Sequence, residues 1–274
     1  MQPFQCERPR SAGNTLSGIV MILLALALLS GPVPSNGAAA ETQMPFAPGE
    51  KLTFLLKWSV VPAGEAVMEV MPMQTINGAA AYHFRLTAES NAFVDVFYKV
   101  RDRIDAYVAA DMSRSVHYRK NAREGEHRRN MRVDFDWQKN TAQYSDQHRT
   151  KKPIKILPGT FDPLSAFYYS RTLDLGEKGI ITRSVTDGVK CVEGVARVIR
   201  RETVEVPSGA YDTYLIEPDL KHVGGVFEKS KDAKISLWVT ADHRRIPVKI
   251  ASKVAVGSFV GELVSIETGR KKET

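Results

Sequence analysis

The sequence predicts a mainly β protein, built as a large curled antiparallel sheet with one short helix near the middle of the chain. Apolar and polar residues alternate with a period of two in about a dozen segments, which is typical of strands with one buried and one wet face. Turn residues such as Asn77-Gly78 separate these segments. Because so many strands rarely stay flat, we expect a half-barrel, a barrel or a sandwich.

The first forty residues have the features of a secretory signal peptide. Arg8 and Arg10 precede an apolar run of twelve residues, Gly18–Leu29, and small residues follow as far as Ala40. A helix of twelve residues rises about 18 Å, too short for a hydrocarbon core of about 30 Å. We therefore expect cleavage after Ala40, a periplasmic location and one β domain over residues 41–274; an uncleaved anchor is the alternative.

The first half of the mature chain contains the clearest alternation. Leu52, Phe54 and Leu56 share one face of the first segment, and the polar stretch Asn121–Asn130 reads as the tip of a hairpin. The strands expected here, in chain order, are Lys51–Val61, Glu65–Val70, Tyr82–Ala88, Lys99–Val108, Ser115–Lys120, Met131–Trp137 and Thr141–Tyr144.

One segment, FDPLSAFYYSRTL, breaks the alternation and predicts the helix. Asp162 is a suitable N-cap, and Pro163 suits the first helical position. Leu164, Phe167 and Tyr168 follow at helical spacing. A helix of two to three turns is expected, with its aromatic residues packed on the sheet.

The second half returns to strands and ends in a meander. The stretch LWVTADHRRIPVKI places apolar alternation on both sides of the polar loop Ala241–Arg244, the length of a hairpin connection. Adjacent residues of an extended chain point to opposite faces, so Asp242 and His243 form a dyad only if the turn brings them together. The strands expected here are Val189–Val206, Tyr211–Glu217, Lys234–Thr240, Arg245–Val254 and Ser258–Ile266.

The sequence contains no motif that predicts catalysis, a metal site or a cofactor. The six histidines are scattered without the spacing of zinc ligands, and the mature chain keeps a single cysteine, Cys191. Phosphate-binding glycine motifs and a nucleophile elbow are missing. We expect Cys191 in the core and no catalytic residue, metal or cofactor.

The apolar residues of two strands form the candidate ligand site. On the concave face of a curled sheet, closed by the Asp162 helix, they would bind a lipid or another apolar molecule. The alternatives are a structural or protein-interaction module of the cell envelope, whose protein partner is unknown, and a hydrolase of an envelope polymer that uses Asp242, His243 and Arg245. The candidate ligand-binding residues are Leu52, Phe54, Leu56, Trp58, Phe135 and Trp137.

A basic patch is the second candidate site. The net charge is +7 over the full sequence, and an exported protein meets anionic lipids and polymers rather than nucleic acid. Glu124 and Glu126 partly offset the patch, so a solvated loop is the alternative to a contact with anionic envelope surfaces. Its members are Arg119, Lys120, Arg123, Arg128, Arg129 and Arg132.

Three stretches together resemble the exported bacterial family DUF3108, a domain of unknown function: APGEKLTFLLKWSVVPAGEAVMEV, FDPLSAFYYSRTL and LWVTADHRRIPVKIASKVAVGSFVGEL. The resemblance covers nearly all of the mature chain. It implies a periplasmic, mostly antiparallel β protein, with no established activity to transfer. By looser analogy the fold is similar to half-barrel carriers of lipoproteins. The positions that match the family pattern, and that we expect to be structural, are Gly64, Asp162, Trp238, Asp242, Arg245 and Pro247.

Overall fold

The computed structural model describes residues 44–176, 179–220, 233–254 and 257–269. Over these residues it forms one antiparallel sheet of fourteen strands in the order β8-β7-β6-β5-β4-β3-β2-β1-β14-β13-β12-β11-β10-β9. The expected signal peptide, residues 1–40, lies outside the described residues. Of the described helices, none is long and apolar enough to cross a membrane.

The strands are short at the two edges of the sheet and longest in β2 and β10. Their bounds are β1 (Lys51–Trp58), β2 (Val61–Ile76), β3 (Ala79–Ser90), β4 (Arg101–Ala109), β5 (Ser115–Glu124), β6 (His127–Asp136), β7 (Thr141–Asp146), β8 (Ile154–Lys155), β9 (Ile180–Thr186), β10 (Cys191–Val206), β11 (Gly209–Pro218), β12 (Lys234–Thr240), β13 (Pro247–Val254) and β14 (Gly257–Glu267).

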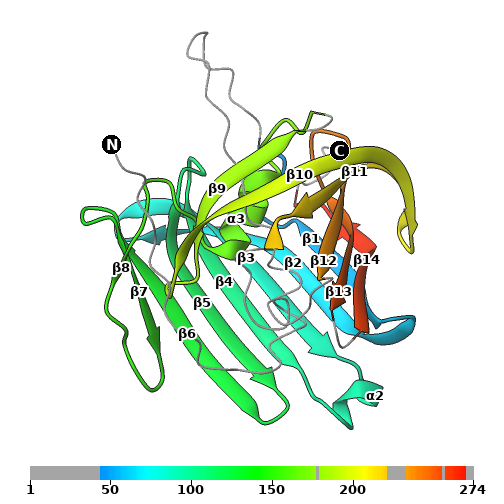
Figure 1. Ribbon diagram of the computed structural model, residues 1–274, viewed down its shortest axis with the longest axis horizontal. Helices are drawn as coiled ribbons and strands as arrows, with labels where there is room; N and C mark the ends of the chain where they lie inside the picture. The colour runs from blue at the N-terminus through cyan, green and yellow to red at the C-terminus, as the bar shows by residue number, and fades with distance from the viewer. Residues whose placement is uncertain (1–43, 177–178, 221–232, 255–256, 270–274) are drawn as a thin grey trace.

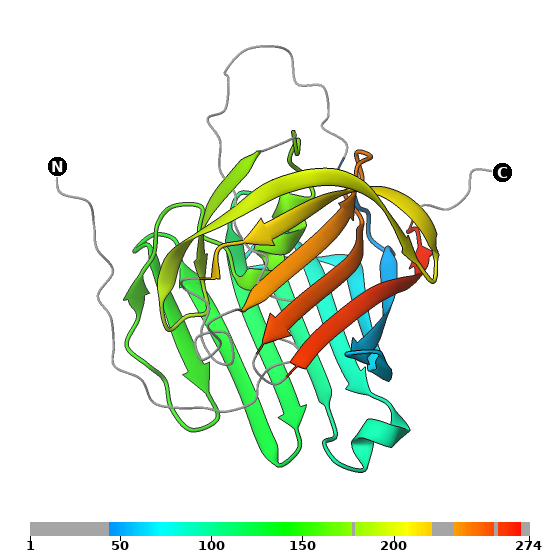
Figure 2. The same cartoon turned by 45° about the vertical axis from the view of Figure 1, so that its right-hand side comes forward.

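The sheet curls strongly on itself, so the sandwich alternative is wrong and the barrel-like alternatives are confirmed (Figures 1 and 2). One short segment joins strands from the two sides of the curl. The carbonyl of Thr160 accepts from the N–H of Ser115 in β5, and Phe161 exchanges two backbone hydrogen bonds with Ser184 and Thr186 of β9. Backbone pairing therefore bridges the two sides of the sheet at this point.

The concave face of the sheet forms the core, as the alternation predicts. In β4, Ile104, Ala106 and Val108 are fully buried, whereas Arg103 on the other face is exposed. The helix α3 (Pro163–Ser170) packs on the concave side against β3, β4 and β9. Because thirteen strands, all but β8, contribute buried residues to one apolar interior, the core is continuous across the sheet.

The predicted helix is confirmed, and its N-cap is completely buried. The Asp162 carboxylate accepts hydrogen bonds from the N–H groups of Leu164 (3.0 Å) and Ser165 (2.9 Å), as an N-cap does. Its other oxygen accepts from the hydroxyl of Ser115 at 2.5 Å. Burial raises the pKa of Asp162, although these hydrogen bonds act in the opposite direction.

A buried ion pair lies at the C-terminal end of α3. The guanidinium of Arg171 donates to both carboxylate oxygens of Glu50, at 2.5 and 3.0 Å. It also donates to the carbonyl of Arg244, in the turn between β12 and β13, and lies over the rings of Phe46 and Tyr168. One side chain thus ties α3 to the N-terminal segment and to a hairpin of the opposite wall.

The stretch LWVTADHRRIPVKI is a hairpin turn, as expected. The carboxylate of Asp242 accepts from the hydroxyl of Thr240 (2.5 Å) and from the N–H of Arg244 (3.2 Å). Arg245 donates to the carbonyl of Ala241 (2.8 Å), and His243 is exposed. The contacts of Asp242 and Arg245 therefore stabilise the turn.

Three elements differ from the expectation. The one-turn helix α2 (Ala92–Asp95), the strand β9 and the two-residue strand β8 were not predicted. The expected polar tip, Asn121–Asn130, is paired strand except at Gly125 and Glu126. The pairing continues because Ala122 points into the core while Arg123 lies on the wet face, so polarity alone does not mark a loop.

Candidate functional site

The two ends of the curled sheet are different, because antiparallel strands place their turns alternately at opposite ends. The α3 end holds α3, the buried ion pair and the Thr160–Phe161 bridge. The α2 end holds the turn between β1 and β2, the helix α2 and the turn between β5 and β6 (Figure 1).

Six large apolar side chains are exposed at the α2 end. They come from the β1–β2 turn and from α2 with the two residues after it, which lie side by side because Asn91 bonds to the carbonyls of Pro62 and Ala63. Single exposed apolar residues are ordinary, but a group marks a contact surface. We call this group the apolar rim: Trp58 (54% exposed), Val60 (84%), Val61 (48%), Phe93 (64%), Val96 (76%) and Phe97 (76%).

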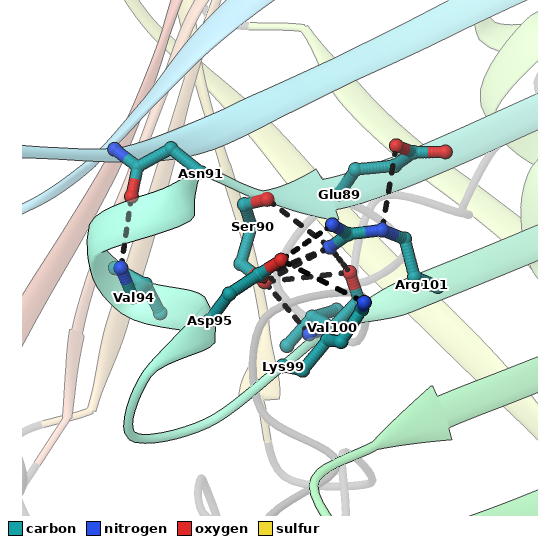
Figure 3. Close-up of polar contacts among 8 residues, drawn as sticks. All are labelled: Glu89, Ser90, Asn91, Val94, Asp95, Lys99, Val100 and Arg101. Carbon is teal, nitrogen blue, oxygen red and sulfur yellow. Dashed lines mark hydrogen bonds and ion pairs between the residues drawn. The ribbon is translucent and has the colours of Figure 1, made fainter.

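Polar contacts hold the helix α2 in place (Figure 3). The side chain of Asn91 caps the helix by accepting from the N–H of Val94 at 3.0 Å. Asp95 accepts from the hydroxyl of Ser90 at 2.5 Å and from Arg101 at 2.6 Å. These hydrogen bonds, from Arg101 first and Ser90 second, lower the pKa of Asp95. The apolar residues are thus presented on an anchored turn.

A glycine allows β2 to lie close to the end of β3, just before α2. A Cβ atom on Gly64 would lie 2.1 Å from the carbonyl oxygen of Glu89 and 2.9 Å from the Cα of Ser90. Real atoms do not approach this closely, so any larger residue would push apart β2 and the end of β3. Gly64 is therefore structural, and it sets the position of the apolar rim.

A small apolar pocket lies next to the rim, between β1–β3 and β13–β14. Its volume is about 30 Å³, which is enough for one or two water molecules but not for an acyl chain. Leu56 and Phe259 in its wall are only half buried. The lining residues are Leu56, Lys57, Ala63, Ala88, Glu89, Ser90, Val100, Ile250, Phe259, Val260 and Gly261.

A second hollow at the α2 end is basic. It measures about 220 Å³ and is lined by three arginines, Arg101, Arg103 and Arg123, with Thr87, Asn121 and the carboxylates of Glu89 and Asp102. Arg101 pairs with Asp95 and Glu89, and Arg103 pairs with Asp105 at 2.6 Å. Arginine is the residue best suited to phosphate groups, because its planar fork donates two parallel hydrogen bonds.

The six predicted ligand-binding residues do not form one site. Leu52 and Phe54 are buried in the core, and Leu56 lines the apolar pocket. Trp58 is 54% exposed because it is the last residue of β1. It stays in step with Leu56 along β14, where Leu56 lies opposite Gly261 and Trp58 lies opposite Phe259.

Phe135 in β6 and Trp137, the residue that follows this strand, are far from this pocket. Phe135 and Trp137 stack on each other at 5.8 Å, and Trp137 donates to the carbonyl of Ser115 near the α3 end. β2 to β5 separate them from β1, so the expected joint site with Leu56 and Trp58 is wrong in its geometry. Alternation identifies a shared face but not the position along a strand.

The predicted basic patch is split between the two faces of the sheet. Four of the arginines share the outer face: Arg119, Arg123, Arg128 and Arg132. In the register of β5 and β6, Arg119 lies opposite Arg132, and Arg123 lies opposite Arg128. Lys120, between them in sequence, is buried beside Asp102, and burial lowers its pKa. The expectation that Lys120 belongs to the surface patch is therefore wrong, because neighbouring residues of a strand face opposite sides.

Arg129 also faces away from the outer patch. Its register partner is the buried Ala122, and its guanidinium donates to the hydroxyl of Tyr144 at 3.2 Å and lies over the same ring. The outer patch gains Arg101 and Arg103 from β4 instead, which pair with acidic neighbours along the sheet. The sequence did not reveal that Arg101 and Arg103 join the outer patch, because they are far from it in sequence and come close only when β4 pairs with β5.

The remaining family-pattern residues make structural contacts. Trp238 donates to the carboxylate of Glu202 at 2.8 Å, and Pro247 is buried at the start of β13. Arg245 is buried over Tyr214, with positive φ. Among the described residues, no group of three or more His, Cys, Asp or Glu side chains is arranged to hold a metal ion.

Sequence reasoning missed most of the apolar rim. The rim residues of α2 lie in AFVDVF, an apolar stretch between two strands that is too short for a helical period and does not alternate. The available signal was its composition: a connection that contains two phenylalanines and two valines is unusual, because connections are normally polar.

The architecture and site define a curled, barrel-like antiparallel β protein with an apolar rim at one end. The sequence profile described as "Protein of unknown function (DUF3108)" matches residues 53–264. The chain belongs to this family. A comparison with curated proteins found no match.

One solved structure has the same fold at low identity, and two others are less similar. A β-barrel-like protein of the domain of unknown function DUF1849 from Brucella abortus is 11% identical, with a TM-score of 0.53, over 82% of this chain and 100% of that chain. A candidate exported protein with a YmcC-like fold from Bacteroides fragilis is 11% identical, with a TM-score of 0.37, over 82% and 98%. A candidate lipoprotein from Parabacteroides distasonis is 10% identical, with a TM-score of 0.35, over 82% and 98%.

Proposed function

We propose that the protein is an exported, non-enzymatic binding protein of the cell envelope, and that it binds a lipid-like chain at the α2 end. The observation that supports this is the apolar pocket beside the apolar rim. Apolar contact surfaces of this kind bind apolar molecules, each buried methylene contributing about 0.8 kcal/mol.

The pocket has to widen to accept a chain. At about 30 Å³ it is smaller than a lipid tail, but Leu56 and Phe259 in its wall are only half buried, and widening requires these two side chains to move. The α3 end is filled by stacked rings, with the ring centroids of Phe84 and Tyr168 3.8 Å apart. The ligand is therefore expected at the α2 end rather than along the whole concave face.

Export is part of the proposal and has its own test. Residues 1–40 carry the basic, apolar and small-residue regions of a signal peptide. Cell fractionation followed by mass spectrometry is expected to find the protein in the periplasm with Glu41 as its first residue. A full-length chain in the membrane fraction would contradict this.

Ligand binding is tested on protein purified gently from the periplasm. Native mass spectrometry and analysis of an organic extract are expected to show a bound lipid, and the emptied protein should take up a fluorescent fatty acid. A clean protein that also fails to take up the fatty acid would refute the proposal.

A matched pair of variants locates the site. Leu56→Gln puts a polar group into the apolar pocket, whereas Leu55→Gln changes the adjacent leucine on the opposite face of β1. An uncompensated polar group costs about 1–3 kcal/mol, so fatty acid affinity should fall roughly five- to 150-fold in the first variant. The second variant should bind like the wild type. Equal losses in both would place the site elsewhere.

A second candidate function is a protein-interaction module. The edge strand β9 begins at Ile180, which is 60% exposed, and edge strands bind extended peptides by adding a strand. Cross-linking in cells through a photoreactive residue at Ile180 is expected to capture one partner if this function holds. No specific adduct there would leave lipid binding as the better explanation.

A further inference from the structure

We propose that the α2 end docks on the surface of an anionic phospholipid bilayer, with the apolar rim in the lipid interface and the outer arginines on phosphate groups. This goes beyond ligand binding, because docking requires no molecule in the pocket. It rests on two independent features that meet at one end of the sheet, the apolar rim and the basic hollow.

The apolar rim has the chemistry and position of an interfacial anchor. Trp58 lies at the end of β1, and Phe93 and Phe97 belong to α2 and the turn after it, with their rings in edge contact at 5.8 Å. Aromatic side chains are favoured at the boundary between water and lipid. Figures 1 and 2 place α2 at the far end of the sheet from α3, where no described element covers it.

Cations surround the rim and select the kind of membrane. Arg123 and Arg128 are exposed at the β5–β6 turn, and Lys99, two residues after Phe97, is exposed and lies 3.9 Å from Asp95. Lys253 is exposed near the β13–β14 turn and lies opposite Ser258 of β14. The carbonyl of Ser258 accepts from the N–H of Ser59, so this cation lies close to the β1–β2 turn. Clustered cations beside an apolar anchor bind anionic headgroups.

Carboxylates at the same end limit the attraction but do not remove it. Glu89 and Asp95 are exposed in part and are paired with Arg101, and Glu126 is exposed in the β5–β6 turn. Arg103 is held by Asp105. Of the three arginines that line the hollow, Arg123 therefore has the fewest carboxylates competing with phosphate for its guanidinium. Arg128 lies next to it and donates only to backbone carbonyls.

The first test measures co-sedimentation with vesicles of phosphatidylcholine alone and of phosphatidylcholine with one third phosphatidylglycerol. The wild type is expected to bind the anionic vesicles at least tenfold more tightly. Because exposed cations drive this preference, it should decline as salt rises. Equal binding to both vesicles, or none to either, would overturn the proposal.

Two matched pairs of variants identify the surface. Phe93→Ser with Phe97→Ser is expected to weaken vesicle binding at least tenfold, whereas Leu157→Ser with Ile180→Ser, at exposed apolar positions outside the rim, should change it less than twofold. Likewise Arg123→Glu with Arg128→Glu should abolish the preference for anionic vesicles. The control Lys152→Glu with Arg197→Glu makes the same charge change at other exposed sites and should preserve it.

Two further readouts separate this proposal from its alternatives. Leu56→Gln should lose fatty acid uptake yet still bind vesicles, so failure of the ligand site and failure of docking are distinguishable. Analytical ultracentrifugation tests a second copy of the chain as the occupant of the rim. A dimer that the Phe93→Ser, Phe97→Ser variant dissolves, together with unchanged vesicle binding by that variant, would overturn membrane docking.

Discussion

The two ends of the sheet differ in which side chains they bury. The α3 end buries charged groups, whereas the α2 end exposes apolar ones. At the α3 end charged groups are buried and satisfied, as in the ion pair of Arg171 with Glu50 and the cap formed by Asp162. At the α2 end Val96 and Phe97 are each 76% exposed. Burying charge and exposing apolar surface both cost stability, but only exposed apolar surface is available to a partner.

Two aspartates, one at each end of the sheet, show the same contrast in their pKa values. Asp162, at the α3 end, has a raised pKa because burial disfavours its charged form. Asp95, at the α2 end, has a lowered pKa because Arg101 and Ser90 donate to it in a wetter setting. The first carboxylate belongs to the packed interior, and the second anchors a surface turn.

The largest predicted effect is at the α3 end. Glu50→Ala removes the partner of a buried guanidinium and should lower the free energy of unfolding by about 3–5 kcal/mol, measured by urea denaturation. Lys51→Ala breaks the neighbouring but exposed pair with Glu267 and should cost less than about 1 kcal/mol. If both variants lost a similar free energy of unfolding, the buried pair of Glu50 with Arg171 would contribute no more than the exposed pair of Lys51 with Glu267.

An intermediate effect is predicted where α2 meets the sheet. Gly64→Ala forces a Cβ against the backbone of Glu89 and Ser90, and overpacking of this kind costs about 1–3 kcal/mol. Gly176→Ala has open space around the new atom and serves as the control, with a change within about 0.5 kcal/mol. The alanine at position 64 should also weaken vesicle binding. If the Gly64→Ala variant is as stable as the wild type and binds vesicles normally, Gly64 does not set the position of the apolar rim.

The smallest effect is a pH dependence of opposite sign at the two ends. A raised folded-state pKa means that wild type loses stability relative to Asp162→Asn as the pH rises through the folded pKa of Asp162. A lowered pKa means that wild type loses stability relative to Asp95→Asn as the pH falls through the folded pKa of Asp95. Urea denaturation between pH 2 and 8 compares the pairs, and trends of equal sign would contradict the assignment.

The sequence predicts the interior better than the surface that this account assigns to function. Period-two alternation locates the inward faces of the strands, and Asp162-Pro163 locates α3, because both depend on local rules. The exposure of Trp58 depends on what surrounds the end of β1, and the separation of Lys120 from its arginine neighbours depends on strand pairing. Such features arise from contacts between segments, so a linear pattern does not reveal them.

The position of α2 shows the same limit. One helical turn has too few residues for a period, and its place beside the β1–β2 turn depends on hydrogen bonds of Asn91 to Pro62 and Ala63. The composition of AFVDVF indicates an unusual connection, but only the folded chain shows that Phe93 and Phe97 join Trp58 in one rim.

The most direct test of the central claim places the same reporter at the two ends. An environment-sensitive fluorophore is attached through Ala92→Cys in α2 or Ala110→Cys beyond β4, both exposed, in a Cys6→Ser chain where Cys191 is buried. On anionic vesicles the emission from position 92 should shift to the blue, as in an apolar setting, while that from position 110 stays unchanged. Equal shifts, or a shift at position 110 alone, would contradict docking through the α2 end.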